Sequence, residues 1–158
     1  MIPEKHFEVL KFLKEKFSNQ DLNWALTGST SFAIQGLDFK PNDIDLQTDK
    51  ASAYKIGQIL TDHTVREVKF SSNGKIKSHF GKFKIQGLEV EVMGDLQKKY
   101  QGEWTSAPDI QKNTKKAEYK GEKFPVFKLE YEIEGYRKIG RAEKSEKIRK
   151  NAEEAGLI

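Results

Sequence analysis

An alternation of polar and apolar residues at positions 43–48, Asp-Ile-Asp-Leu-Gln-Thr, sets the strongest limit on the fold of this chain. Successive side chains of a β-strand point to opposite faces, so Asp43 and Asp45 would share one face while Ile44 and Leu46 share the other. The two carboxylates would lie roughly 6.5 to 7 Å apart along the strand. The segment therefore predicts a strand that buries one face in a core and presents paired carboxylates on the other.

A second feature precedes this strand. Residues 22–27 are predicted to form a short buried strand, and residues 29–36 a short helix that ends at Gly36. Gly28 would end the strand and let a ligand approach the backbone, and Ser29 would cap the helix. Free N–H groups at a helix start favour anions, so the junction suits a phosphate. An ordinary strand–turn–helix junction, with Ser29 as a structural cap, is the alternative.

Acidic pairs with the same spacing recur elsewhere in the chain. They occur at Glu89/Glu91 and in the series Glu130/Glu132/Glu134. An isolated Asp-x-Asp is therefore also compatible with an ordinary solvated surface. Its combination with the Gly-Ser junction is what indicates a site that binds a cation and a phosphate together.

The remaining pattern predicts an α+β fold, with a small mixed β-sheet flanked by helices and a C-terminal helical segment. We expect a single domain over residues 1–158, with sheet and helices over about 1–128 and C-terminal helices over 129–158. The expected pieces are helices at 4–17 and about 50–61, extended segments at 64–70, 77–85, 88–93 and 124–127 with a tight turn at Gln86-Gly87, a polar loop at 111–123, and a helical region at 129–155 interrupted at Gly135 and Gly140.

Composition narrows the class of protein. The 28 basic and 24 acidic residues give a net charge of +4, which favours phosphate-bearing partners but is too small for a dedicated nucleic-acid groove. There is no cysteine, and hence no disulfide framework or thiolate metal site. The chain has no apolar run of the roughly 18 residues that a membrane helix requires. A soluble cytoplasmic protein is expected.

The Gly-Ser pair and the acidic strand together resemble a known signature. Gly28-Ser29 is followed, after 13 residues, by Asp43-Ile44-Asp45-Leu46. This is similar to the DNA polymerase β-type nucleotidyltransferase superfamily, and in particular to its small members related to lincosamide and aminoglycoside nucleotidyltransferases. The resemblance implies the nucleotidyltransferase fold.

The resemblance also implies a third carboxylate on a later strand. The stretch Gly-Leu-Glu-Val-Glu-Val-Met-Gly-Asp offers Glu89, Glu91 and Asp95. Glu91 is favoured, because the small relatives have a hydrophobic–acid–hydrophobic triplet there, matched by Val90-Glu91-Val92. Glu89 would share its strand face and remains the competitor.

In those relatives a later helix carries a tyrosine, an arginine and a lysine, matched in order by Tyr136, Arg141 and Lys144. The resemblance implies nucleotide binding for Arg141 and Lys144. Relatives often have aspartate after the lysine, whereas this chain has Ser145. A solvated charged helix face is the alternative.

The chemistry that the resemblance implies is transfer of a nucleoside monophosphate from a nucleoside triphosphate to an acceptor, with release of pyrophosphate. Asp43, Asp45 and Glu91 would bind two Mg²⁺ ions, or Mn²⁺, and Gly28 and Ser29 would hold the β- and γ-phosphates. The acceptor stays open between a small molecule, RNA and protein. A P-loop and a serine hydrolase are unsupported, because neither motif is present.

A non-catalytic nucleotide- or partner-binding module of the same fold, similar to an antitoxin, is the main alternative. Loss of a carboxylate would mark it, and all three are present.

Overall fold

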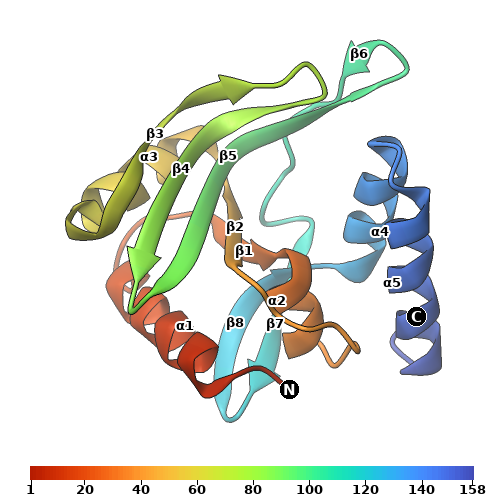
Figure 1. The fold of residues 1–158 in the computed structure, drawn as a ribbon, viewed down its shortest axis with the longest axis horizontal. Coiled ribbons are helices and arrows are strands. Elements are labelled where there is room, and N and C mark those ends of the chain that lie inside the picture. The colour runs from red at the N-terminus through yellow and green to blue at the C-terminus, as the bar shows by residue number, and fades with distance from the viewer.

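A mixed eight-stranded sheet organises the computed structural model, which describes all residues 1–158 (Figure 1). The strands are β1 (Trp24–Thr27), β2 (Ile44–Thr48), β3 (Thr64–Ser72), β4 (Ile76–Ile85), β5 (Leu88–Tyr100), β6 (Glu103–Trp104), β7 (Thr114–Tyr119) and β8 (Glu122–Phe127). The helices are α1 (Glu4–Phe17), α2 (Gly28–Ile34), α3 (Lys50–Ile59), the 3₁₀ helix η1 (Thr61–His63), α4 (Leu129–Lys138) and α5 (Ala142–Glu154).

The strand order is β3-β4-β5-β2-β1-β8-β7, and β6 pairs with β5 outside this path. The pairs β2–β5 and β1–β8 are parallel, and the other pairs are antiparallel. Strand β2 therefore lies at the centre, between β1 and β5. The expected α+β class, a mixed sheet flanked by helices, is confirmed.

The main core lies on the sheet face covered by α1 and α3. Ile44 and Leu46 of β2 and Val90 and Val92 of β5 are fully buried in it, together with apolar side chains of both helices. Because neighbouring strand residues alternate between faces, the residues between them point away from this core. Burial of one face thus fixes which side chains of β2 and β5 are available to a site.

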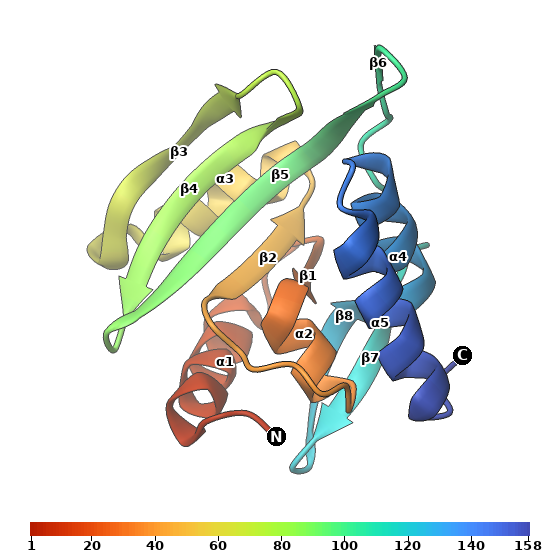
Figure 2. The same ribbon diagram turned by 45° about the vertical axis from the view of Figure 1, so that its right-hand side comes forward.

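A second, smaller core joins α2 to the two C-terminal helices. It contains Phe32, Leu37, Leu129, Ile148 and Ala152. Figures 1 and 2 show α4 and α5 side by side, across the molecule from α3 and the β3 edge. None of the helices has the length and apolar character that a membrane span requires.

Several local predictions are confirmed. Helix α1 follows Pro3 and ends at Phe17 as expected. The hairpin between β4 and β5 turns at Gln86 and Gly87, whose φ angles of 52° and 82° are those of a tight type I′ turn. Gly140, at φ 78°, separates α4 from α5.

Two predictions are wrong. The segment 111–123 is not a polar loop, because β7 and the start of β8 form a hairpin there that turns at Lys120 and Gly121. Strand β7 lies at the sheet edge, so three of its six residues are exposed and none is buried, and its sequence looks like that of a loop. Gly135 does not interrupt the helix either. It lies inside α4, where an added Cβ would come within 3.0 Å of Lys98 Nζ.

Two phenylalanines on adjacent strands test the position of the core. Phe83 of β4 is fully buried, whereas Phe70 of β3 is 59% exposed. Phe83→Ala should lower the free energy of unfolding by about 3 to 5 kcal/mol, because it leaves a cavity in the main core. Phe70→Ala, the matched control, should cost under about 1 kcal/mol. Urea denaturation measures both, and equal losses would contradict this core.

Candidate active site

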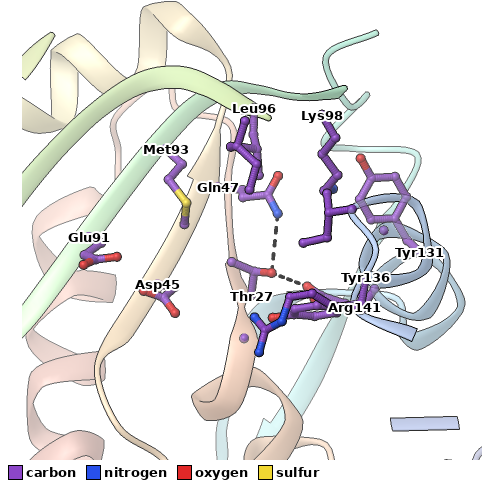
Figure 3. Close-up of a pocket in the computed structure, with 15 residues that line it drawn as sticks. Thr27, Asp45, Gln47, Glu91, Met93, Leu96, Lys98, Tyr131, Tyr136 and Arg141 are labelled. Carbon is purple, nitrogen blue, oxygen red and sulfur yellow. Dashed lines mark hydrogen bonds between the residues drawn. The ribbon is translucent and has the colours of Figure 1, made fainter. Parts of the chain in front are cut away.

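The register of three central strands brings two of the predicted carboxylates together. Asp45 of β2 is the parallel register partner of Glu91 of β5 and the antiparallel partner of Thr27 of β1. All three side chains lie on the face turned away from the main core, where they line one pocket (Figure 3). A strand pattern recognised in the sequence thus becomes a local concentration of negative charge.

This charge concentration perturbs Asp45. Burial, the neighbouring charges of Glu91 and Asp43 and a hydrogen bond with Glu91 together raise the pKa of Asp45 to about 7. Lys82, outside the pocket lining, has its Nζ 2.9 Å from Glu89 and 3.9 Å from Glu91. The lining itself contains three acids, Asp45, Glu91 and Glu132, and two basic residues, Lys98 and Arg141.

Glu89 and Glu91 differ in their surroundings. Glu91 lines the pocket beside Asp45, whereas Glu89 forms its ion pair with Lys82 and does not line the pocket. The geometry is compatible with the choice of Glu91 as the third carboxylate. That choice stays a prediction.

The pocket has a volume of about 220 Å³ and lies between the sheet and α4. Four of the seven predicted site residues line it: Gly28, Asp45, Glu91 and Arg141.

The other three, Ser29, Asp43 and Lys144, lie outside the pocket lining. Asp43 precedes β2 by one residue and acts on Asp45 through its charge. Lys144 Nζ lies 5.3 Å from the ring centroid of Tyr136, and the guanidinium carbon of Arg141 lies at the same distance from that ring.

Asp45 and Glu91 supply carboxylate oxygens that a divalent cation could use. Carboxylate oxygens are the ligands that Mg²⁺ prefers, and the repulsion around Asp45 is the kind that a bound cation relieves. The side chains are not, however, gathered into a group of three or more metal-ligating residues. The carboxylates of Asp43, Asp45 and Glu91 are chemically suited to bind a hard cation such as Mg²⁺. That they converge on one ion stays a prediction.

The Gly-Ser junction differs in detail from the prediction. Ser29 does not cap α2: Thr27 is the N-cap residue, without a side-chain capping bond, and Ser29 Oγ accepts a hydrogen bond from the Asn42 backbone N–H at 3.2 Å. Gly28 has φ 75°, and a Cβ at this position would lie 2.8 Å from Asp45 Oδ2. The missing side chain of Gly28 thus makes room for the Asp45 carboxylate.

Glu132 of α4 was missed by the sequence reasoning, which grouped it with solvated surface acids. It is only 5% exposed, and the Thr27 hydroxyl donates a hydrogen bond to its carboxylate. Burial raises the pKa of Glu132 to about 7. The helical period held the missing signal, because Glu132 lies three residues after Leu129 and four before Tyr136, on the apolar stripe of α4.

Replacing Asp45 tests its electrostatic environment. Because folding raises the pKa of Asp45 from its ordinary value of 3.8 to about 7, this group contributes stability that is fully present below about pH 4 and is lost as pH rises towards 7. Asp45→Asn should therefore be more stable than wild type at pH 7.5 in EDTA, by about 1 to 3 kcal/mol, and nearly equal at pH 4. Thermal melts at both pH values measure this. A variant less stable than wild type at pH 7.5 would contradict the predicted repulsion.

Comparisons with known proteins identify the family of this chain. The sequence model of the family described as aminoglycoside-2''-adenylyltransferase matches residues 9–153. A Thermotoga maritima protein of known crystal structure, provisionally described as a nucleotidyltransferase, is 42% identical to this chain in sequence. The match covers 98% of this chain and 96% of the Thermotoga chain, and the two structures superpose with a TM-score of 0.85. No curated protein matches significantly.

Two more distant structures share the fold. The lincosamide antibiotic adenylyltransferase LnuA, with lincomycin bound, is 14% identical over 93% of this chain and 98% of its own, with a TM-score of 0.55. ANT(2'')-Ia, in complex with adenylyl-2''-tobramycin, is 13% identical over 92% of this chain and 95% of its own, with a TM-score of 0.57. At these identities the likeness concerns the fold alone. The family match covers nearly the whole chain, and we conclude that this protein belongs to the aminoglycoside-2''-adenylyltransferase family of nucleotidyltransferases.

Proposed function

We propose that this protein is a Mg²⁺-dependent nucleotidyltransferase that transfers a nucleoside monophosphate from a nucleoside triphosphate to an acceptor. The observation that carries the proposal is the pairing of Asp45 with Glu91 in a pocket that also contains Gly28 and Arg141. Carboxylates on one wall and a guanidinium near the other suit a polyphosphate that is bound together with a cation.

Asp43, Asp45 and Glu91 would hold two Mg²⁺ ions, or Mn²⁺. When bound, these ions would activate the acceptor oxygen and neutralise charge on the triphosphate. Asp43, just before β2, and Asp45, within it, would be the shared ligands. Glu91, on the neighbouring strand, would lie beside the acceptor and take its proton as the acceptor oxygen bonds to the α-phosphorus and the bond to the leaving pyrophosphate breaks.

The triphosphate would lie between the Gly28-Ser29 turn and the C-terminal helices. Arg141 lines the pocket, and Lys144 is close enough for its charge to act on Asp45. Burial lowers the pKa of Lys144, and the nearby charges of Arg141 and Lys147 lower it further, so an anion would be favourable beside this group.

Ser145, where relatives often have aspartate, donates its hydroxyl to the Ile133 carbonyl at 2.7 Å. This residue fixes α5 against α4 and leaves the phosphate contacts to its neighbours.

The acceptor is the open part of the proposal. LnuA and ANT(2'')-Ia are described in complexes with an antibiotic and an adenylylated antibiotic. We propose a small molecule as the first class to test for this chain, because the pocket beside Glu91 is only about 220 Å³ in volume. RNA and protein remain alternatives. Transfer of label from each α-³²P nucleoside triphosphate to pooled small molecules, RNA and protein would identify the class of acceptor.

No observation favours the non-catalytic alternative, since all three carboxylates are present.

Nucleotide binding should depend on metal, because a triphosphate placed beside Asp45 and Glu91 would otherwise be repelled. ATP or GTP should bind measurably only when Mg²⁺ is present. Asp43→Asn should lose most of this Mg²⁺-dependent binding. Asp62→Asn, an exposed acid on η1, is the matched control. Isothermal titration calorimetry measures the affinities, and tight binding in EDTA would refute the proposed site.

The third carboxylate can be identified by two matched variants. Glu91→Gln should reduce transfer by at least about 100-fold, because it removes a ligand and a proton acceptor. Glu89→Gln, two residues away on the same strand, should retain most activity, because Glu89 is paired with Lys82. Single-turnover transfer assays measure both rates. The reverse ranking would move the site by one strand pleat.

A further inference from the structure

Glu132 of α4 lies against Thr27 at the end of β1. Its carboxylate accepts a hydrogen bond from the Thr27 hydroxyl, and the nearby Gly28 backbone N–H favours its charged form. Lys98 of β5 and Lys144 of α5 attract it electrostatically. Burial of an acid costs free energy that an apolar side chain would avoid, so a buried acid here calls for an explanation other than stability.

On the sheet side, the contacts of Glu132 lead directly to Asp45. Thr27 is the register partner of Asp45, and its hydroxyl also accepts a hydrogen bond from Gln47 Nε2 at 3.4 Å. Gly28 packs so closely on the Asp45 carboxylate that a Cβ would come within 2.8 Å of Oδ2. Movement of the Thr27–Gly28 turn would therefore displace one wall of the space that Asp45 occupies.

On the helix side, α4 is tied to the residues proposed to bind the triphosphate. The backbone N–H of Arg141 donates a hydrogen bond to the Tyr136 carbonyl at 2.9 Å, and the Ser145 hydroxyl donates one to the Ile133 carbonyl at 2.7 Å. Glu132 thus joins two structural units, one carrying Arg141 and Lys144 and the other carrying Asp45. In Figure 3, Arg141 and Tyr136 lie close to Thr27, across the pocket from Glu91.

We propose that Glu132 is a positioning residue, which holds the Thr27–Gly28 turn so that the carboxylates of the sheet and the cations of the C-terminal helices keep the spacing that a metal-bound triphosphate requires. The inference rests on the proposed function. It differs from a purely structural role, because loss of this anchor would weaken nucleotide binding while the domain stays folded.

The test uses two matched pairs of variants in the full chain. Glu132→Gln replaces the carboxylate by an amide of the same size, and all variants are compared above pH 7, where the wild-type acid is ionised. Glu134→Gln is its control on the same helix, an exposed acid paired with Arg137. Thr27→Val removes the hydroxyl at constant shape, and Thr27→Ser restores it. If Glu132→Gln fails to fold by circular dichroism, the Thr27 pair decides the outcome.

Two measurements are made on each variant. In ¹⁵N–¹H spectra, Glu132→Gln should shift the Gly28 amide signal and speed its hydrogen exchange at least about tenfold, and Glu134→Gln should leave both unchanged. By calorimetry, Glu132→Gln and Thr27→Val should each weaken Mg²⁺-ATP binding about tenfold, the usual effect of losing a charge-assisted hydrogen bond, and Thr27→Ser should bind like wild type.

A folded Glu132→Gln protein with the Gly28 signal and the Mg²⁺-ATP affinity of wild type would overturn the inference. A changed signal with unchanged affinity would overturn it as well, because Glu132 would then be only structural. Failure of the wild-type protein to bind Mg²⁺-ATP would instead refute the proposed function, and the Gly28 signal would then decide on the anchor alone.

Discussion

The parallel pairing of β2 with β5 is the constraint on which the rest of the structure depends. Its register puts Asp45 beside Glu91 on one face, while Ile44 and Val90 are buried together on the other. A slip of one residue in either strand would place a carboxylate in the main core and an apolar side chain in the pocket. The packing of α1 and α3 on the apolar face therefore also holds the carboxylates together against their mutual repulsion.

Much of the fold follows from residue periodicity, and the exceptions have physical causes. Segments with one apolar face, such as α1 and β2, have a period that identifies both their type and their buried side. Strand β7 lacks that signal, because it is an edge strand and only Ala117 and Tyr119 pack on the main core. Its best marker was the Lys120-Gly121 turn. Gly135 was misjudged because its role is tertiary: it makes room for the Lys98 side chain.

The candidate site likewise contains residues that local sequence patterns reveal and one residue that only tertiary packing reveals. Asp45, Glu91 and Gly28 could be proposed from the sequence because each lies within a strand or at its end, although the choice of Glu91 over Glu89 came from the family resemblance. Glu132 could not be assigned from acidic spacing, since its burial depends on how α4 docks against β1. The geometry adds a link between these parts, because the turn that contacts Asp45 is also the turn that Glu132 holds. The C-terminal helices are thereby coupled to the sheet site through polar contacts as well as through the second core.

Cation binding at Asp45 and Glu91 is the step on which the proposed nucleotide binding depends. A crystal structure with Mn²⁺ and a non-hydrolysable ATP analogue would test this most directly, because anomalous scattering identifies the ion. We predict an anomalous peak within about 2.0 to 2.3 Å of the Asp45 carboxylate, with the phosphates reaching from that ion towards Gly28 and Arg141. A nucleotide bound elsewhere, or one bound in this pocket without an ion at Asp45, would contradict the account.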